Sequence, residues 1–178
     1  MIETEPTDVR PPTPDTPPKD TMGRAQRSFG AYYRKNSATL EGRNLSAFEE
    51  ALAVERALFV SGGGHARAAG HASPEGPDNA GLSQRRADNA IEVVRNAFRG
   101  QLAVSASGIG YGDRAAIQDG LIRPENIPAG PAGAAQRVEY AKQERGIFLQ
   151  FRKVMLWVSG ILLIEIRLSK VLPKGEGS

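Results

Sequence analysis

The sequence predicts an α+β fold, a two-layer sandwich in which helices cover one face of a mixed four-stranded sheet. Three observations support this prediction. Strand-like and helix-like patterns alternate along much of the chain, small residues occupy the third expected element, where a helix could pack closely, and a loop rich in proline and glycine precedes the last expected strand. The chain has 178 residues, which suits one domain with appendages.

The order of the expected elements is β-α-β-α-β-β, from hydrophobic periodicity and turn residues. Ser83 is the expected N-cap of the second helix, because a serine side chain can accept a hydrogen bond from the first helical turn. In the last strand, Val138 and Tyr140 share one face. The expected elements are a strand over 28–34, a helix over 44–59, a strand over 65–70, a helix over 83–97, a strand over 102–109, a long loop over 114–134 and a strand over 136–141.

Composition divides the chain into three parts. Residues 1–25 are rich in proline and acidic groups and have few large apolar side chains, so we expect a disordered arm without an export signal. Residues 26–142 form the expected domain. The segment 143–178 is apolar, but its uncharged run over 154–164 is shorter than the roughly 20 residues that span a membrane. We therefore expect no membrane span. The apolar stretch over 147–172 packs on the domain or docks a protein partner.

The charge balance and the absence of cysteine exclude several classes of site. The formal net charge is +3 and the sequence pI is about 9.4, which suits a partner that carries carboxylates. This charge is far below what would indicate a nucleic-acid partner. The chain has no cysteine, so a disulfide framework and a thiolate site are both excluded.

The stretch from Gly70 to Asp88 combines a loop with the start of a helix. Pro74, Gly76 and Pro77 exclude a continuous helix or a central strand in its first half. Its second half places Arg85 and Arg86 in the first helical turn, where the helix dipole also favours negative charge. The sequence therefore predicts a site for an anionic group here.

Several motifs in register resemble the OmpA-like domain, the peptidoglycan-associating module of OmpA proteins, peptidoglycan-associated lipoproteins and MotB-type stators. The family pattern is Gly-His-Thr-Asp, a glycine turn, Asn, Leu-Ser-x-x-Arg-Ala on a helix, Gly-Tyr-Gly, and Asn-Arg-Arg-Val on the final strand. The order and spacing agree over roughly residues 28–142. The matching residues are Gly70-His71, Gly76, Asn79, Leu82-Ser83-Gln84-Arg85-Arg86-Ala87, Gly110-Tyr111-Gly112 and Gln136-Arg137-Val138.

The resemblance implies a non-enzymatic module that binds the diaminopimelate of the peptidoglycan stem peptide, without cofactor or metal, in the cell envelope. In the family, a loop aspartate takes the ammonium of diaminopimelate and a helix arginine takes its carboxylate. The arginine corresponds to Arg86, the loop asparagine to Asn79, and an arginine of the final strand to Arg137.

The aspartate position of the family is Ser73 in this chain. A serine can accept a hydrogen bond from an ammonium but cannot neutralise it, so binding is expected to be weaker by roughly 10- to 100-fold. Glu75 and Asp78 lie in the same loop, and either carboxylate could take the place of the aspartate; both could equally be solvated turn residues.

Other chemistries have weaker support in the sequence. His65 and His71 are the only histidines, and no third ligand accompanies them in a metal-binding pattern. Ser73, His71 and Glu75 crowd one loop, but no oxyanion hole is evident for a hydrolase. The alternative to peptidoglycan binding is a protein-interaction module of an envelope-associated assembly, such as a contractile injection apparatus, that no longer binds peptidoglycan.

Overall fold

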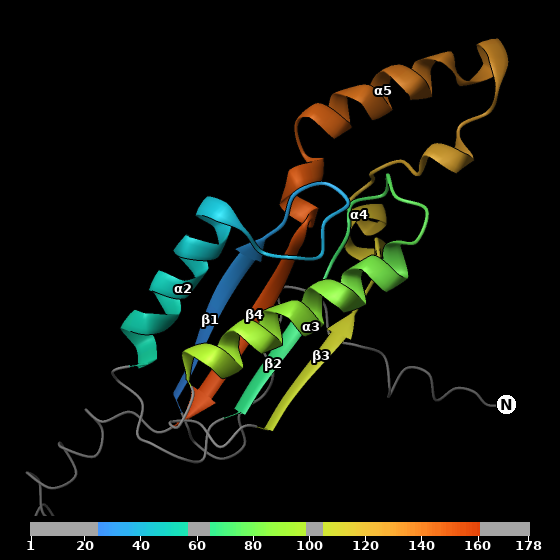
Figure 1. The fold of residues 1–178 in the computed structure, drawn as a ribbon. Coiled ribbons are helices and arrows are strands. Elements are labelled where there is room, and N and C mark those ends of the chain that lie inside the picture. Colours follow the sequence, from blue (N-terminus) through green and yellow to red (C-terminus); the bar gives the residue numbers. More distant parts are fainter. Residues whose placement is uncertain (1–24, 57–64, 99–104, 161–178) are drawn as a thin grey trace, which may run out of the picture.

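The computed structural model describes residues 25–56, 65–98 and 105–160 (Figure 1). The elements of these parts are β1 (Ala25–Tyr32), α2 (Gly42–Arg56), β2 (His65–Gly70), α3 (Asn79–Ala97), β3 (Ser105–Gly110), α4 (Arg114–Gln118), three short 3-10 turns (Pro124–Asn126, Gly130–Gly133 and Phe148–Phe151), α5 (Ala134–Arg145) and β4 (Lys153–Gly160).

The sheet has four strands in the order β1-β4-β2-β3. β4 runs antiparallel to both of its neighbours, β1 and β2, whereas β2 and β3 are parallel and are connected through α3. The expected α+β class with a mixed four-stranded sheet is confirmed. The expected strand over 65–70 has the bounds of β2, and the first and third strands are found with shifted ends.

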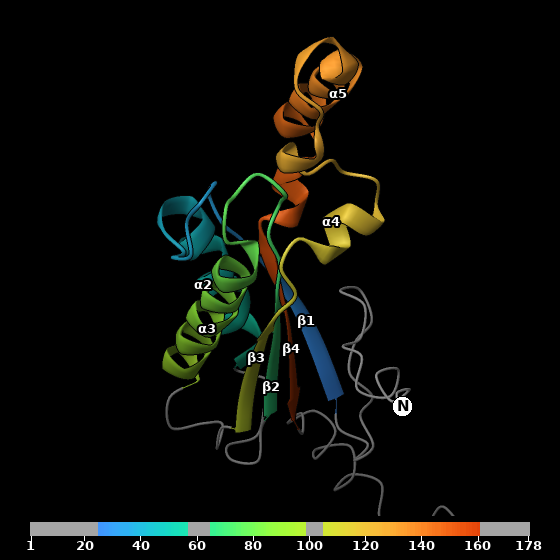
Figure 2. The same ribbon diagram turned by 90° about the vertical axis from the view of Figure 1, so that its right-hand side faces the viewer.

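Helices α2 and α3 pack on one face of the sheet, and the main core lies between them and the strands (Figure 2). Small residues on β2 and β3 let α3 approach closely, as expected. A Cβ atom at Gly70 would collide with the Ser83 carbonyl oxygen of α3, so glycine is required by contact at this position. The largest buried members of this core are Phe29, Tyr33, Phe48, Leu52, Ile91, Phe98 and Leu156.

The fourth strand is not where the sequence analysis expected it. Residues 136–141 belong to the helix α5, and the fourth strand is β4, which begins at Lys153. The alternation of Val138 and Tyr140 was a weak signal, because α5 has no fully buried residue and Val138 is exposed, so burial imposes no period on this stretch. β4 lies between two strands, which explains its nearly continuous apolar sequence. The sheet therefore extends past residue 142, where the expected domain ended.

Helix α5 extends beyond the end of the sheet (Figures 1 and 2). Its base rests on a second small core of Ala116, Leu121, Phe148 and Phe151, against which Tyr140 packs. The Lys35 ammonium pairs with the Glu144 carboxylate at 2.9 Å and links α5 to the loop between β1 and α2. Among the described helices, none is long and apolar enough to span a membrane. Of the arm expected over 1–25, residues 1–24 lie outside the described residues, and Ala25 begins β1; residues 161–172 of the apolar stretch also lie outside them.

Candidate functional site

The loop between β2 and α3 starts as a continuation of the sheet. The His71 amide donates to the Lys153 carbonyl oxygen at 2.8 Å, and the Ala72 amide donates to the Gly112 carbonyl oxygen at 2.9 Å. Residues 71–74 are consequently buried, although they form part of a loop. Ser73 and Glu75 of this loop therefore lie at the end of the sheet where β4 begins.

The start of α3 differs from the expectation. The N-cap is Asp78, whose side chain accepts a hydrogen bond from the Gly81 amide at 3.0 Å, so the helix begins at Asn79. Ser83, the expected N-cap, is wrong in that role because it lies inside the helix. Its hydroxyl is buried, donates to the Ala80 carbonyl oxygen and accepts from the Gly112 amide, both at 2.8 Å. Ser83 therefore joins α3 to the end of β3.

Arg86 is fully buried on α3, between the loop that follows β1 and the loop that follows β2. Its guanidinium donates to three backbone carbonyl oxygens, those of Ser37 at 2.7 Å, His71 at 2.9 Å and Arg34 at 3.1 Å. The Tyr33 ring lies 5.4 Å from the guanidinium carbon. Burial lowers the pKa of Arg86 to about 10, while the negative charge of Glu75 opposes this shift. Arg86 therefore stays protonated at neutral pH and holds the two loops on α3.

Glu75, Ser73 and Arg152 meet at the head of β4. The Arg152 Nε donates to the Glu75 Oε2 at 3.1 Å and to the Ser73 Oγ at 3.2 Å. The Glu75 side chain is 6% exposed and the Arg152 side chain 13%. The other carboxylate oxygen of Glu75, Oε1, is buried and has no hydrogen-bond partner in the described part of the chain. A buried carboxylate oxygen in this state is costly and marks a place where a donor is missing.

These three groups and Arg86 form one cluster, which we call the Glu75 cluster: Ser73, Glu75, Arg86 and Arg152. The charges of both Glu75 and Arg152 act on the pKa of Arg86, and Arg86 donates to the carbonyl oxygen of His71, two residues before Ser73. The pKa of Tyr140 on α5 is raised by burial and by the nearby carboxylates of Glu144 and Glu75. The base of α5 therefore borders the cluster.

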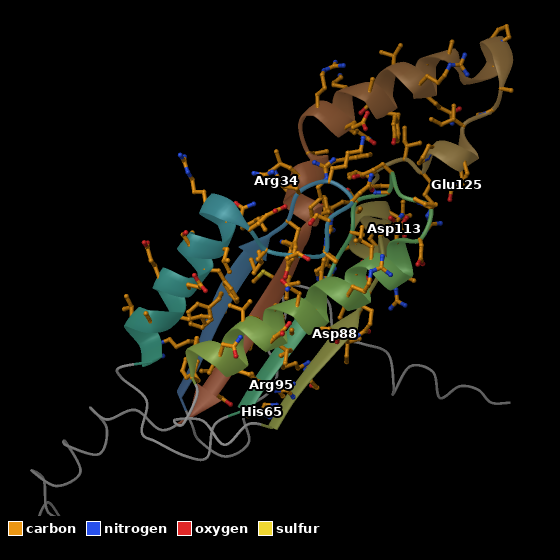
Figure 3. All side chains as sticks on the ribbon, viewed as in Figure 1. Arg34, His65, Asp88, Arg95, Asp113 and Glu125 are labelled. Carbon is orange, nitrogen blue, oxygen red and sulfur yellow. The ribbon has the colours of Figure 1, made fainter. Side chains whose placement is uncertain are left out.

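A second ionic cluster lies at the end of β3 and contains Asn79, Asp113 and Arg123. The Arg123 guanidinium donates to both carboxylate oxygens of Asp113, at 2.8 and 2.9 Å, and the Asn79 amide donates to Asp113 at 3.3 Å. These hydrogen bonds lower the pKa of Asp113, and the hydrogen bond from Arg123 makes the largest contribution. A pocket of about 400 Å³ borders this cluster and includes Arg114 and Tyr111. Figure 3 shows Asp113 at the same end of the sheet as Arg34, opposite His65.

The structure therefore separates the residues that the sequence grouped in one site. Ser73, Glu75 and Arg86 come together, whereas Asn79 belongs to the Asp113 cluster. Asp78 is an exposed helix cap whose nearest cation, Arg85, is 3.9 Å away. Arg137 lies on α5 and not on a strand; its guanidinium donates to the Pro128 and Gly130 carbonyl oxygens. The ligand contacts expected of Asn79, Asp78 and Arg137 stay predictions.

Arg152 is the site residue that the sequence analysis missed. The Arg-Arg-Val pattern expected on the final strand was assigned to Gln136-Arg137-Val138, but the final strand starts after Arg152 and continues with Lys153-Val154. A basic pair directly before a continuous apolar run was the available signal. Within the described ranges, no three His, Cys, Asp or Glu side chains cluster as metal ligands.

Comparison with known proteins finds similarity among solved structures only. No family model and no curated protein matches the chain. The peptidoglycan-associated lipoprotein of Burkholderia pseudomallei is 14% identical, with a TM-score of 0.38, and the match covers 72% of this chain and 88% of that one. The OmpA-like domain of FopA1 from Francisella tularensis is 13% identical, with a TM-score of 0.38, and the match covers 81% and 79%.

A third similar structure is the periplasmic domain of MotB, at 11% identity and a TM-score of 0.44, covering 83% of this chain and 69% of that one. OmpA-like domains are thus among the solved structures that the chain resembles, as its motifs indicate.

Proposed function

We propose that this chain is a non-enzymatic anchoring module of the cell envelope, which binds the peptidoglycan stem peptide at the Glu75 cluster through its diaminopimelate residue. The observation that carries the proposal is the buried carboxylate oxygen of Glu75, which has no hydrogen-bond donor among the described residues and lies in a cluster that also holds two arginines. The family motifs in the sequence supply the chemical identity of the ligand.

Glu75 replaces the missing aspartate better than Asp78 does. The Asp78 carboxylate is exposed and is used as a helix cap, so an ammonium there would compete with the Gly81 amide and with water. Glu75 is shielded from water, which strengthens its attraction for a cation. Ser73, at the position of the family aspartate, adds a hydroxyl beside Glu75, and this hydroxyl accepts a hydrogen bond from Arg152.

Sedimentation with insoluble diaminopimelate-type peptidoglycan tests the proposal. We expect the wild-type chain in the pellet and its release by free meso-diaminopimelate. Glu75→Gln keeps the shape of the side chain but removes the charge, so its affinity should fall by on the order of 10- to 100-fold. Asp78→Asn is the matched control and should sediment as the wild type does. A wild-type chain that stays in the supernatant would contradict the proposal.

The second candidate is a protein-interaction module that does not bind peptidoglycan. The observation in its favour is Arg86, whose side chain is fully buried and donates to three backbone carbonyl oxygens, as a purely structural arginine would. Within the segment over 147–172, the strand β4 is a less suitable docking surface than its composition indicated, because it lies in the middle of the sheet; residues 161–172 lie outside the described residues. Absence of sedimentation together with an intact fold would favour this candidate.

A further inference from the structure

We propose that Arg152 selects the ligand by binding the carboxylate of a free α-amino-acid group, while Glu75 binds its ammonium. This inference rests on the proposed function and assigns the carboxylate contact to Arg152 instead of Arg86. It makes a compact zwitterion, such as the free end of a diaminopimelate side chain, the chemical group that the site recognises.

The pairing of Glu75 with Arg152 leaves hydrogen-bonding groups unused that such a zwitterion could engage. Among the described residues, the Arg152 guanidinium forms hydrogen bonds only through Nε, and it meets only one of the two Glu75 oxygens. The Glu75 Oε1 is left as an acceptor and the two terminal nitrogens of Arg152 as donors. An acceptor and a planar donor pair side by side complement an ammonium and a carboxylate that share one carbon atom.

Arg86 is poorly placed for the same task. Three of its five N–H groups already donate to backbone carbonyl oxygens, and its side chain has no exposed surface. A ligand could use Arg86 as its main carboxylate contact only if the loops that hold those carbonyl oxygens moved away. Arg152 retains some exposure, so a ligand reaches it with less rearrangement.

The charge of the cluster also favours an additional carboxylate. Two guanidinium groups, those of Arg86 and Arg152, face one carboxylate, that of Glu75, so the buried groups carry an excess of one positive charge. A zwitterion leaves the net charge of the cluster unchanged, but it pairs the charges locally: its carboxylate meets the Arg152 guanidinium, and its ammonium satisfies the remaining oxygen of Glu75.

The backbone holds Arg152 in place for this contact. Its amide donates to the Leu149 carbonyl oxygen at 3.3 Å, and its carbonyl oxygen accepts from the Tyr33 amide at 2.7 Å. Arg152 therefore sits at the junction of a 3-10 turn with β4, held on the other side by β1.

Two synthetic stem peptides separate the carboxylate contact from the ammonium contact. The tripeptide L-Ala-γ-D-Glu-meso-diaminopimelate ends in a free amino-acid group, whereas L-Ala-γ-D-Glu-L-Lys offers an ammonium without the neighbouring carboxylate. We expect calorimetric titration of the full chain to show a preference for the first peptide of on the order of 10- to 100-fold. Arg152→Gln should bring this preference close to one, and Glu75→Gln should weaken both peptides by a similar factor.

Arg85→Gln is the matched control, because Arg85 is exposed on the same helix as Arg86. It should keep the wild-type preference. Circular dichroism checks the fold of each variant. If Arg152→Gln does not fold, Arg152→Lys replaces it in the test: it keeps the charge but loses the planar fork, so it should retain part of the preference.

The possible results distinguish this inference from the proposed function. If the wild type prefers the diaminopimelate peptide and Arg152→Gln keeps that preference while Arg86→Lys loses it, the assignment to Arg152 is overturned and the proposed function stands. Equal wild-type affinity for the two peptides also overturns the assignment. If the wild type binds neither peptide nor peptidoglycan, the proposed function itself fails.

Discussion

The Glu75 cluster and the Asp113 cluster lie at the same end of the sheet, and in each a carboxylate accepts a hydrogen bond from an arginine. They differ in how completely the carboxylate is satisfied. Arg123 meets both oxygens of Asp113, and Asn79 adds a third hydrogen bond. Arg152 meets only one oxygen of Glu75, which is the more deeply buried of the two carboxylates. The Asp113 carboxylate is thus satisfied by the protein on both oxygens, whereas in the Glu75 cluster, our proposed ligand site, one carboxylate oxygen has no partner among the described residues.

The largest expected effect comes from removing Arg86. Arg86→Ala leaves three carbonyl oxygens without their donor and removes one of the two guanidinium charges that act near Glu75, so we expect a loss of about 3–5 kcal/mol in the free energy of unfolding. Urea denaturation measures it, with the exposed Arg85→Ala as control. A variant that keeps its stability but no longer sediments with peptidoglycan would show that Arg86 is a ligand contact and not a structural link.

Neutralising the two carboxylates one at a time should affect two different properties of the protein, stability for Asp113 and peptidoglycan binding for Glu75. Asp113→Asn loses a bidentate pair that is partly screened by water at Arg123, so we expect it to cost about 1–2 kcal/mol of stability and to leave peptidoglycan binding unchanged. Glu75→Gln should cost less stability and more binding. Denaturation and sedimentation on the same protein samples compare them, and equal effects of the two variants on binding would contradict the distinction between the clusters.

The stabilisation by Asp113 should depend on pH. Its pKa is depressed in the folded protein, mainly by the Arg123 hydrogen bond, so the contribution is fully present above the ordinary aspartate pKa and is lost as the pH falls through the folded value. The difference in urea midpoint between the wild type and Asp113→Asn should therefore be constant near neutral pH and shrink below about pH 4. A difference that persists unchanged at pH 2 would show that packing, and not charge, accounts for it.

The smallest expected effect on stability comes from breaking the ion pair between α5 and the loop that joins β1 to α2. Lys35→Ala breaks an exposed ion pair with Glu144, which should cost at most about 1 kcal/mol and less at high salt. If α5 restricts access to the Glu75 cluster, the variant should bind the diaminopimelate peptide with a faster association rate. Stopped-flow measurement at low and high salt checks this, and Lys142→Ala, which removes another exposed lysine charge, this one on α5 itself, is the control. An unchanged rate would separate α5 from ligand entry.

Much of the fold could be predicted because local patterns agree with the tertiary structure. The small residues of β2 indicated both the strand and the close approach of α3, which Gly70 requires by contact with Ser83. The apolar positions Ala87, Ala90, Ile91 and Val94 of α3 face the core as their helical spacing indicates. The fourth strand was missed because a short alternating pattern also occurs in an exposed helix such as α5, while a strand buried between two others does not alternate.

For the candidate site, the sequence by itself determined the loop of Ser73 and Glu75, the helix that carries Arg86, and the question of which carboxylate could replace the aspartate. Only the tertiary structure decided that Asp78 caps α3, that Arg137 lies on α5, and that Arg152 joins Glu75. Glu75 and Arg152 are 77 positions apart and meet because β4 lies beside β2 in the sheet. Strand order depends on packing the whole chain, and no local pattern of residues encodes it.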